Sequence, residues 1–407
     1  MKRKAIYAVV GAIVIAVIGG TRLYRSQLAK QDGYLGKEVV YYQDSSEPIA
    51  EEEVVTAAPD VTASPAVSEQ TASPSPTQAV QDTPVATMMP SPTAAGKYEK
   101  ILAKEKVQVY ESSGTAVVGN AGYELYNYVN SAASRYAKAV NKLTKLVDES
   151  VKVYDLIVPT SMGITFPDNR KKKVNSSSQK EALASIEEML SGRETFVPLY
   201  DKLMRHRTED IYFRTDHHWT SLGAYYAYQA FCEAKGIQPN ELSAYHKQKI
   251  KGFEGSFYRE TKNKNLTPDT MEVLYPLSNK KLSMKYTTTE GQKISAPVIA
   301  DATKYGKGMK YSAYIAGDNP YTIIHNAQIE DKSSCVVIKE SFGNAFVPFL
   351  TDHYHTVYVI DYRYWEGRLA DFLTKKKIRE VLLVNNVSMT RNSYLLGKFM
   401  SCLNGAK

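Results

Sequence analysis

The sequence is poor in the residues from which disulfide-rich and zinc-ribbon proteins are built. Its three cysteines, Cys232, Cys335 and Cys402, are odd in number and far apart. Neither a disulfide framework nor a zinc ribbon fits that pattern. Cys335 stands in an apolar run, where cysteine usually acts as a small buried hydrophobe. We therefore assign no chemistry to any of the three.

Basic residues are absent from positions 38–96, a stretch that holds nine acidic residues and is rich in Pro, Ser, Thr and Ala. Such a composition cannot bury enough apolar surface to offset the entropy lost on ordering the chain. The sequence therefore predicts a disordered acidic linker over residues 26–96.

An uncharged run at residues 5–20 precedes the linker, with Lys-Arg-Lys at residues 2–4 before it. The run is slightly short for a spanning helix, but its flanks can extend it. No small-x-small cleavage site follows, so we predict a cytoplasmic tip and an uncleaved signal anchor over residues 1–25. The basic cluster before the run predicts a single-pass protein of the cell membrane whose main domain is extracytoplasmic.

Positive charge is concentrated in the remainder of the chain. Residues 1–37 carry a net charge of +6 and residues 38–96 carry −9, so that of the total of +8 residues 97–407 hold +11. This charge favours an anionic partner, such as an acidic glycan, a wall polymer or lipid headgroups. It is spread along the domain rather than gathered in a patch, so we expect no nucleic-acid partner.

The pattern of residues 97–407 predicts an α/β domain. Continuous β-branched runs predict strands at residues 151–160, 335–341, 356–362 and 380–386, and helical patterns predict helices near residues 123–148, 342–354, 367–377 and 391–403. This alternation indicates a parallel sheet flanked by helices. Residues 247–324 lose the rhythm, and we expect a partly antiparallel β insertion there.

The stretch FRTDHHWT at residues 213–220 holds two of the seven histidines and one of the two tryptophans. A predicted short strand at residues 211–213 precedes it. A predicted helix follows, with Thr220 or Ser221 as a plausible N-cap and Gly236 as a plausible stop. In an extended loop Asp216 and His218 share a face while His217 points elsewhere. A carboxylate beside an imidazole fixes its tautomer and stabilises its protonated form.

Ser341 is the best candidate for a nucleophile to partner this pair. It follows a predicted parallel strand and precedes a predicted helix, the position where α/β sheets build their sites. The helix start also offers free N–H groups for an oxyanion. Ser161 competes with it at another strand end, but the residues after Ser161 are predicted to form a loop.

Two less specific interpretations of the motif stay open. In one, Asp216 caps the following helix and Trp219 packs in the core, so that the motif is structural. In the other, the histidines bind zinc, which needs three or four ligands. The remaining histidines show no ligand spacing, and we expect no metal and no cofactor.

The motif TDHHW, together with IKESFGNAFVPFL, resembles the bacterial DHHW protein family. More distantly, it resembles the SGNH-hydrolase-like domains of alginate O-acetyltransferases, which carry a Thr-Asp-x-His-Trp motif and a downstream serine. The resemblance covers most of residues 98–407 and implies an SGNH-hydrolase-like domain over residues 97–407. It implies Asp216 and His218 as the acid–base pair, Ser341 as nucleophile and no metal. The chain departs from ordinary SGNH hydrolases in lacking an N-terminal Gly-Asp-Ser block.

The resemblance implies a membrane-anchored O-acyltransferase, with acetyl as the expected group, that modifies an extracellular or cell-wall polysaccharide. The acyl donor would come through a multispanning membrane acyltransferase. A carbohydrate esterase with the same triad stays open, as does a non-catalytic glycan-binding scaffold, which predicts no His–Ser contact. Further candidates for substrate binding or oxyanion stabilisation are Asn319, Asn344, Tyr362, Arg363 and Trp219.

Overall fold

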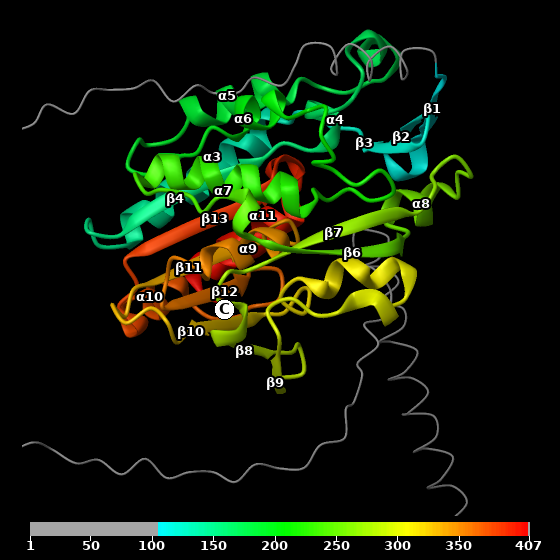
Figure 1. Cartoon of the computed structure of the whole chain (residues 1–407). Coiled ribbons are helices and arrows are strands. Elements are labelled where there is room, and N and C mark those ends of the chain that lie inside the picture. The colour runs from blue at the N-terminus through cyan, green and yellow to red at the C-terminus, as the bar shows by residue number, and fades with distance from the viewer. Residues whose placement is uncertain (1–104, 406–407) are drawn as a thin grey trace, which may run out of the picture. The chain divides into compact units, whose positions relative to one another are not determined.

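The computed structural model describes residues 105–405, which Figure 1 colours from cyan to red. The predicted anchor at residues 1–25 and the predicted linker at residues 26–96 lie outside the described residues. Within residues 105–405, no helix is both long and apolar enough to cross a membrane.

A mixed sheet of eight strands forms the centre of the fold, in the order β5-β4-β13-β11-β12-β10-β8-β9. The five strands from β5 to β12 run parallel, and β10, β8 and β9 run antiparallel to their neighbours. The strand bounds are β4 Lys152–Val158, β5 Thr195–Phe196, β8 Leu282–Thr287, β9 Lys293–Ala296, β10 Tyr321–Asn326, β11 Ser334–Lys339, β12 Thr356–Asp361 and β13 Glu380–Asn386.

The sheet agrees with the predicted α/β class but corrects its topology. The strands predicted from β-branched runs, β4, β11, β12 and β13, are parallel neighbours. Antiparallel pairing was expected within residues 247–324, and β8, β9 and β10 do pair antiparallel. They continue the same sheet, because β10 hydrogen-bonds along the edge of β12 and β8 pairs with β10.

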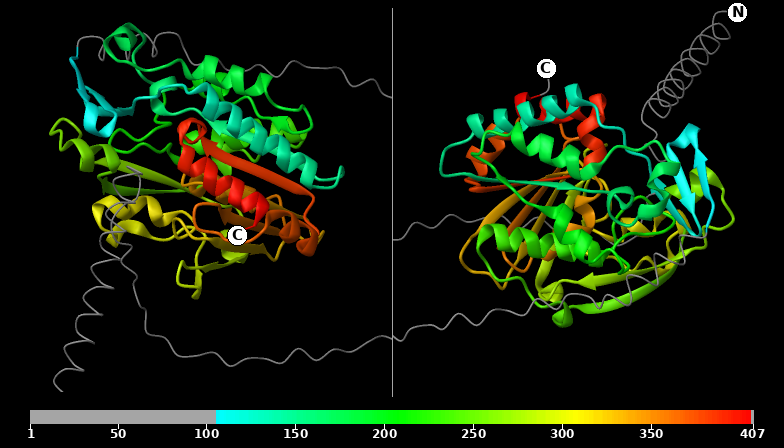
Figure 2. Two further views of the ribbon diagram at one scale, coloured as in Figure 1. Left: turned by 180° about the vertical axis from the view of Figure 1, so that it is seen from behind. Right: turned by 90° about the horizontal axis from the view of Figure 1, so that it is seen from above.

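Helices cover both faces of the sheet, each over its own apolar cluster. One face carries α3 and α11, which lie side by side in Figure 2, together with α5 and α10. The other face carries α6, α7 and α9. The helix bounds are α3 Asn130–Leu146, α4 Ser161–Ile164, α5 Gln179–Glu188, α6 Leu199–Arg205, α7 Ser221–Lys235, α8 Ser256–Thr261, α9 Gly343–Leu350, α10 Leu369–Lys376 and α11 Ser393–Asn404.

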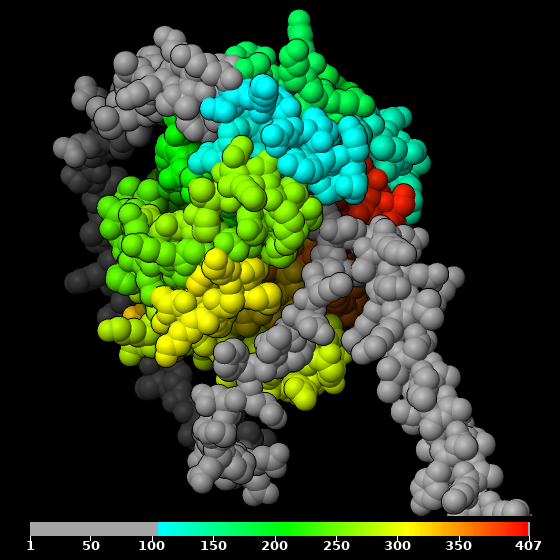
Figure 3. All heavy atoms as spheres, turned by 90° about the vertical axis from the view of Figure 1, so that its right-hand side faces the viewer, coloured from blue at the N-terminus to red at the C-terminus, as the bar shows by residue number. Residues whose placement is uncertain are grey.

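Two small antiparallel sheets stand beside the central one. The first is β1 (Val107–Tyr110), β2 (Thr115–Val118) and β3 (Ala121–Glu124), and the second pairs β6 (His246–Phe253) with β7 (Asp269–Tyr275). Figure 3 shows the first sheet, in cyan, directly against the light-green segment around α8. Val117 there packs with Phe257 and Leu266.

Three local predictions need correction. The helix predicted from residue 123 begins at Asn130, because residues 121–124 pair in β3 instead. The strand predicted at residues 211–213 is an isolated bridge between Tyr212 and Trp219. The segment after Ser161 begins with the short helix α4 rather than the expected loop.

Candidate active site

The loop that carries the DHHW motif leads directly into α7. The predicted caps are present: the Thr220 side chain accepts a hydrogen bond from the Gly223 N–H, and Gly236 ends the helix with a φ of 78°. The Phe213 N–H donates to the His218 carbonyl at 3.2 Å, which closes the loop on itself. The local sequence therefore presents Asp216, His217 and His218 at the start of α7.

Trp219 joins this loop to the turn that carries Ser341. Its indole is fully buried, and its Nε1–H donates to the Phe342 carbonyl at 2.9 Å. The predicted role of Trp219 in substrate binding does not fit this position, because its side chain has no exposed surface. Trp219 instead fixes the distance between two segments that are far apart in the sequence.

Ser341 lies between β11 and α9, as predicted, and its hydroxyl does not cap the helix. The Gly343 and Asn344 amides bond to the carbonyls of Glu340 and Ser341. Within residues 105–405 no acceptor bonds to the Ser341 N–H, which leaves it available to an oxyanion at this helix start.

The structure brings the three predicted catalytic side chains into one hydrogen-bonded line. Asp216 Oδ1 lies 2.6 Å from His218 Nδ1, and His218 Nε2 lies 2.7 Å from Ser341 Oγ. All three residues are buried, with exposed fractions of 4% for Asp216 and 7% each for His218 and Ser341. Both contacts are within the range expected for a nucleophile, its base and the group that orients the base.

Further contacts hold the Asp216 carboxylate in place. Oδ1 also accepts from the His218 N–H at 3.0 Å, and Oδ2 accepts from the Ser256 N–H at 2.8 Å. At Gly255 a Cβ atom would lie 2.1 Å from the Asp216 Cβ, so this close approach requires glycine.

Asp216 is ionised in this setting. Burial alone would raise its pKa, but the electrostatic interactions with His218 and His217 and the hydrogen bonds from His218 and Ser256 outweigh burial and hold the pKa well below its usual range. An ionised Asp216 accepts a hydrogen bond from the Nδ1–H of His218. The other ring nitrogen, Nε2, is then unprotonated and can accept a hydrogen bond from the Ser341 hydroxyl. That tautomer is the one a general base requires.

His217 does not point away from His218 as expected. The two rings pack with their centroids 3.8 Å apart, and His217 Nδ1 lies 2.7 Å from Ser256 Oγ. Burial, followed by the charge of His218, lowers the pKa of His217 to about 3. His217 is therefore neutral at ordinary pH and supports the imidazole of His218 by packing.

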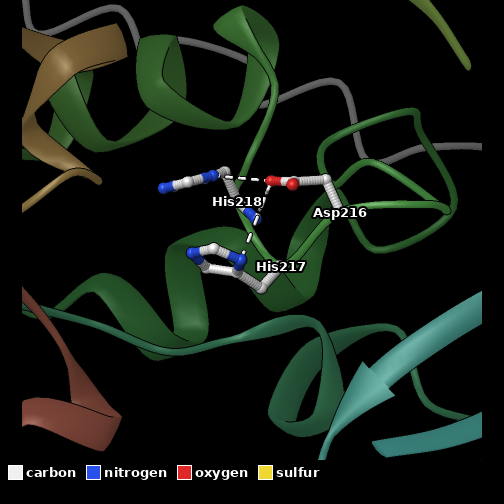
Figure 4. A group of neighbouring side chains, drawn as sticks. All are labelled: Asp216, His217 and His218. Carbon is white, nitrogen blue, oxygen red and sulfur yellow. Dashed lines mark hydrogen bonds and ion pairs between the residues drawn. The ribbon is translucent and has the colours of Figure 1, made fainter. Parts of the chain in front are cut away.

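Within residues 105–405, Asp216, His217 and His218 form a group that could hold a metal ion, since one ligand atom from each lies within 4.8 Å of the others (Figure 4). Both ring nitrogens of His218 already contact Asp216 or Ser341. A cation bound here would replace one of those contacts. The donor set thus fits the hydrogen-bonded relay better than a metal centre.

Tyr311 contacts both His218 and Ser341. It lies in a 3-10 helix at Lys307–Ala313, and its ring stacks on the His218 imidazole at 3.9 Å with an interplanar angle of 11°. Its hydroxyl donates to the Ser341 carbonyl at 3.2 Å. Sequence reasoning missed this residue because nothing distinguishes it among 30 tyrosines.

Glu340 forms hydrogen bonds with the turn that carries Ser341. Its Oε1 accepts from the Asn386 N–H at 2.9 Å, and its Oε2 accepts from Ser341 Oγ at 3.2 Å and from the Phe342 N–H at 3.3 Å. Burial raises the pKa of Glu340. The Ser341 hydroxyl therefore has two acceptors, of which His218 is the closer.

The other predicted binding residues lie near the site but are already engaged. Asn344 is 1% exposed and donates to Asp318, and Asn319 donates to the Ala316 carbonyl. Neither side-chain amide donates to Ser341 Oγ or toward its hydroxyl, so their predicted oxyanion role is not met by this geometry.

Arg363 and Tyr362, the other candidates for substrate binding, also contact residues of the protein itself. Arg363 binds Asp361, which is buried, and Asp318, which is exposed, with distances of 2.7 and 2.9 Å. Tyr362 is 1% exposed and packs near Phe399, so it does not line a groove. These residues support the sheet edge beneath Ser341.

Ser161, the competing serine, is also buried, and its Oγ has no hydrogen-bond partner among the described residues. It follows β4, which is separated from β11 by β13 in the sheet. No described contact links Ser161 to the histidines, so the arrangement favours Ser341.

Comparisons with known proteins agree with the fold. A family model described as DHHW protein matches residues 97–360. The structure of a DHHW family protein from Eubacterium siraeum DSM 15702 is 29% identical, with 74% of this chain and 98% of that chain covered and a TM-score of 0.66. Bacillus cereus PatB1 with a sulfonyl adduct is 17% identical, with 71% and 99% covered and a TM-score of 0.58.

The O-acetyltransferase domain of Pseudomonas putida AlgJ is a weaker structural match, with 11% identity, 73% of this chain and 99% of that chain covered and a TM-score of 0.39. No curated protein matches the chain.

Proposed function

The chain belongs to the DHHW protein family, and we propose that it is a serine O-acyltransferase that esterifies hydroxyl groups of an extracellular or cell-wall polysaccharide. The contact of 2.7 Å between His218 Nε2 and Ser341 Oγ carries this proposal. A scaffold without catalysis was expected to lack that contact. An acetyl group is the acyl group we propose.

In the first half-reaction, His218 Nε2 takes the proton from the Ser341 hydroxyl as its oxygen attacks the acyl carbonyl of the donor. Asp216 stabilises the resulting imidazolium. The Ser341 N–H can donate to the tetrahedral oxyanion. The bond to the donor's leaving group then breaks, the leaving group takes the proton from His218, and an acyl ester remains on Ser341.

In the second half-reaction, His218 takes a proton from a sugar hydroxyl, whose oxygen attacks the acyl carbonyl on Ser341. The Ser341 ester bond breaks, the serine oxygen recovers the proton, and the polysaccharide leaves as an ester. Water in place of the sugar would give hydrolysis through the same atoms. Access of the sugar and exclusion of water at the buried hydroxyl therefore decide between transferase and esterase.

The proposed setting of this reaction is the outer face of the cell membrane. Residues 1–25 would anchor the chain and residues 26–96 would hold the domain away from the bilayer. A multispanning membrane acyltransferase partner would deliver the acyl group. A tether of this kind keeps the domain close to such a donor.

The test compares Ser341→Ala with Ser161→Ala in cells that lack the natural chain. We expect Ser341→Ala to abolish polymer esterification and Ser161→Ala to retain it, since His218 contacts Ser341 and has no described contact with Ser161. Unchanged esterification in the Ser341→Ala strain contradicts the proposal. Adding oligosaccharide to the purified chain with an acyl donor then separates transfer, which gives sugar ester, from hydrolysis, which gives free acid.

A further inference from the structure

Three lysines form a row on the outer face of β6. Lys247, Lys249 and Lys251 are exposed and alternate with Gln248, which is half-buried, and Ile250, which is buried. Residues two apart in a strand point to the same face and lie about 7 Å apart. The three ammonium groups therefore follow a line along the strand, which we call the lysine row.

Little negative charge opposes the lysine row. The strand β7 beside it holds two acidic residues, Asp269 and Glu272. Glu272 contacts Lys247 and Lys249 only loosely, at 3.7 and 3.9 Å, and all three side chains are at least 41% exposed. Such surface pairs contribute little, so the row keeps a positive field.

One end of the row opens into a groove of about 960 Å³. Lys280 and Lys281 line this groove along with Lys247 and Lys249, and so do Tyr275 and Gln328. Ammonium groups bind carboxylates, aromatic rings pack against sugar rings, and amides bond to hydroxyls. This combination suits an acidic glycan.

The other end of the row is bonded to the active-site loop. Asp269, at the start of β7, accepts from the Thr215 N–H at 2.8 Å and from Arg214 Nε at 3.0 Å. The Phe253 carbonyl, at the end of β6, accepts from the Thr215 hydroxyl. Figure 1 shows β6 and β7 running together toward α8, whose first residue donates its N–H to Asp216.

A bulge near the site shapes this end of the strand. The register between β6 and β7 shifts between Lys251 and Phe253, and Gly252 has a φ of 80°, a backbone conformation that favours glycine. The shift turns Phe253 into the core and leaves Lys251 exposed. The lysine row therefore remains at the surface to within a few residues of the active-site loop.

We propose that the lysine row and the groove at its end bind a polysaccharide with repeating carboxylate groups, and hold it along β6 beside the active site. This inference rests on the proposed function, because it names the acceptor of that reaction. The lysine row binds the carboxylates of the polysaccharide, and the Ser341 site esterifies a hydroxyl of the bound polysaccharide.

The experiment measures binding apart from turnover. The full chain carrying Ser341→Ala is titrated into fluorescein-labelled oligogalacturonate, with the fully methyl-esterified oligomer as the uncharged control. We expect the acidic oligomer to bind with an affinity that falls as salt rises, and the esterified oligomer to bind far more weakly. Replacing the row by Lys247→Gln, Lys249→Gln and Lys251→Gln should weaken binding about tenfold or more.

A matched triple variant at the end of α10, Lys375→Gln, Lys376→Gln and Lys377→Gln, removes the same charge elsewhere and should bind as the parent does. Equal loss in both triple variants, no loss in the row variant, or equal binding of the two oligomers overturns the proposal. Loss of binding to phosphatidylglycerol vesicles without loss of oligomer binding would make the row a membrane contact instead, which also overturns it. Since no turnover is needed, the binding result stands whether or not Ser341 is a nucleophile.

Discussion

His218 Nε2 lies 2.7 Å from Ser341 Oγ although 123 residues separate the two along the chain. The next residues in each segment, Trp219 and Phe342, share a second hydrogen bond of 2.9 Å across the same interval. Two adjacent contacts thus fix one separation, and the second involves a fully buried indole. The contact between the His218 imidazole and the Ser341 hydroxyl is therefore held in place by packing in the core.

Asp216→Asn tests the orienting carboxylate. The carboxylate accepts from His218 through Oδ1 and from the Ser256 N–H through Oδ2, whereas an amide has one oxygen. If that oxygen meets Ser256, the NH2 group faces His218 Nδ1, and the ring loses the tautomer that leaves Nε2 basic. We expect kcat to fall by about 10²- to 10⁴-fold, measured as acyl transfer by the purified full chain. Because the pKa of Asp216 is held well below its usual range, acid to pH ~5 should not reproduce this loss through Asp216.

The control for Asp216→Asn is the thermal midpoint, which shows whether the variant folds. A folded variant with wild-type kcat would remove Asp216 from the mechanism.

Tyr311 is predicted to position His218 and Ser341 relative to each other. Burial raises the pKa of Tyr311, so its hydroxyl stays protonated and donates to the Ser341 carbonyl. Tyr311→Phe keeps the stacked ring and should lower kcat by roughly threefold to tenfold, in line with one lost hydrogen bond. Tyr311→Leu also removes the ring that faces the imidazolium and should cost about tenfold more.

The kinetic pattern separates positioning from a loss of structure at Tyr311. The ring stabilises the protonated imidazole, so Tyr311→Leu should move the acid limb of the kcat/KM profile to lower pH, while Tyr311→Phe leaves it in place. If the wild type, Tyr311→Phe and Tyr311→Leu give identical profiles of kcat/KM against pH, Tyr311 contributes to packing only.

Asp155 predicts a pH dependence of stability. It is fully buried, one oxygen accepts from Tyr136 at 2.5 Å, and the other has no partner among the described residues. Burial raises the pKa of Asp155 to about 7. The folded state therefore binds this proton more tightly than the unfolded chain, and the added stability present below pH ~4 is lost as pH rises to about 7.

Asp155→Asn keeps an oxygen for Tyr136 and places an uncharged nitrogen at the unpartnered position. We expect its free energy of unfolding to match the wild type near pH ~4 and to exceed it by a few kcal/mol at pH ~8, as measured by urea unfolding. The exposed variant Asp371→Asn should follow the wild type at both values. Parallel curves for wild type and Asp155→Asn would show that Asp155 does not bind the proton in this way.

Local patterns in the sequence predicted the elements that depend on local physics. The β-branched runs of β11, β12 and β13 and the caps of α7 lie where they were expected, because burial on both faces and helix ends leave strong local signals. The sequence did not show that the three antiparallel strands join the parallel ones in one sheet, because pairing along the β12 edge is set by tertiary contacts that no local pattern shows.

In the active site, too, local patterns identified some residues and missed those that tertiary contacts bring in. The motif and the strand-to-helix position of Ser341 pointed to the three residues that meet in the structure, although their catalytic role stays a prediction. Tyr311 and Ser256 come from segments 30 and 40 residues away from the residues that they contact. Trp219 was a candidate for substrate binding, but its large ring is fully buried, as the structural interpretation of the motif expected.

The most direct test of the account is covalent labelling of the full chain with a sulfonyl fluoride, followed by intact-mass and peptide analysis. The account predicts one sulfonyl group per chain, located on Ser341, and no labelling of the Asp216→Asn or Ser341→Ala variants at the same reagent concentration. A folded chain that stays unlabelled, or one that is labelled at another residue while Ser341 is untouched, would contradict it.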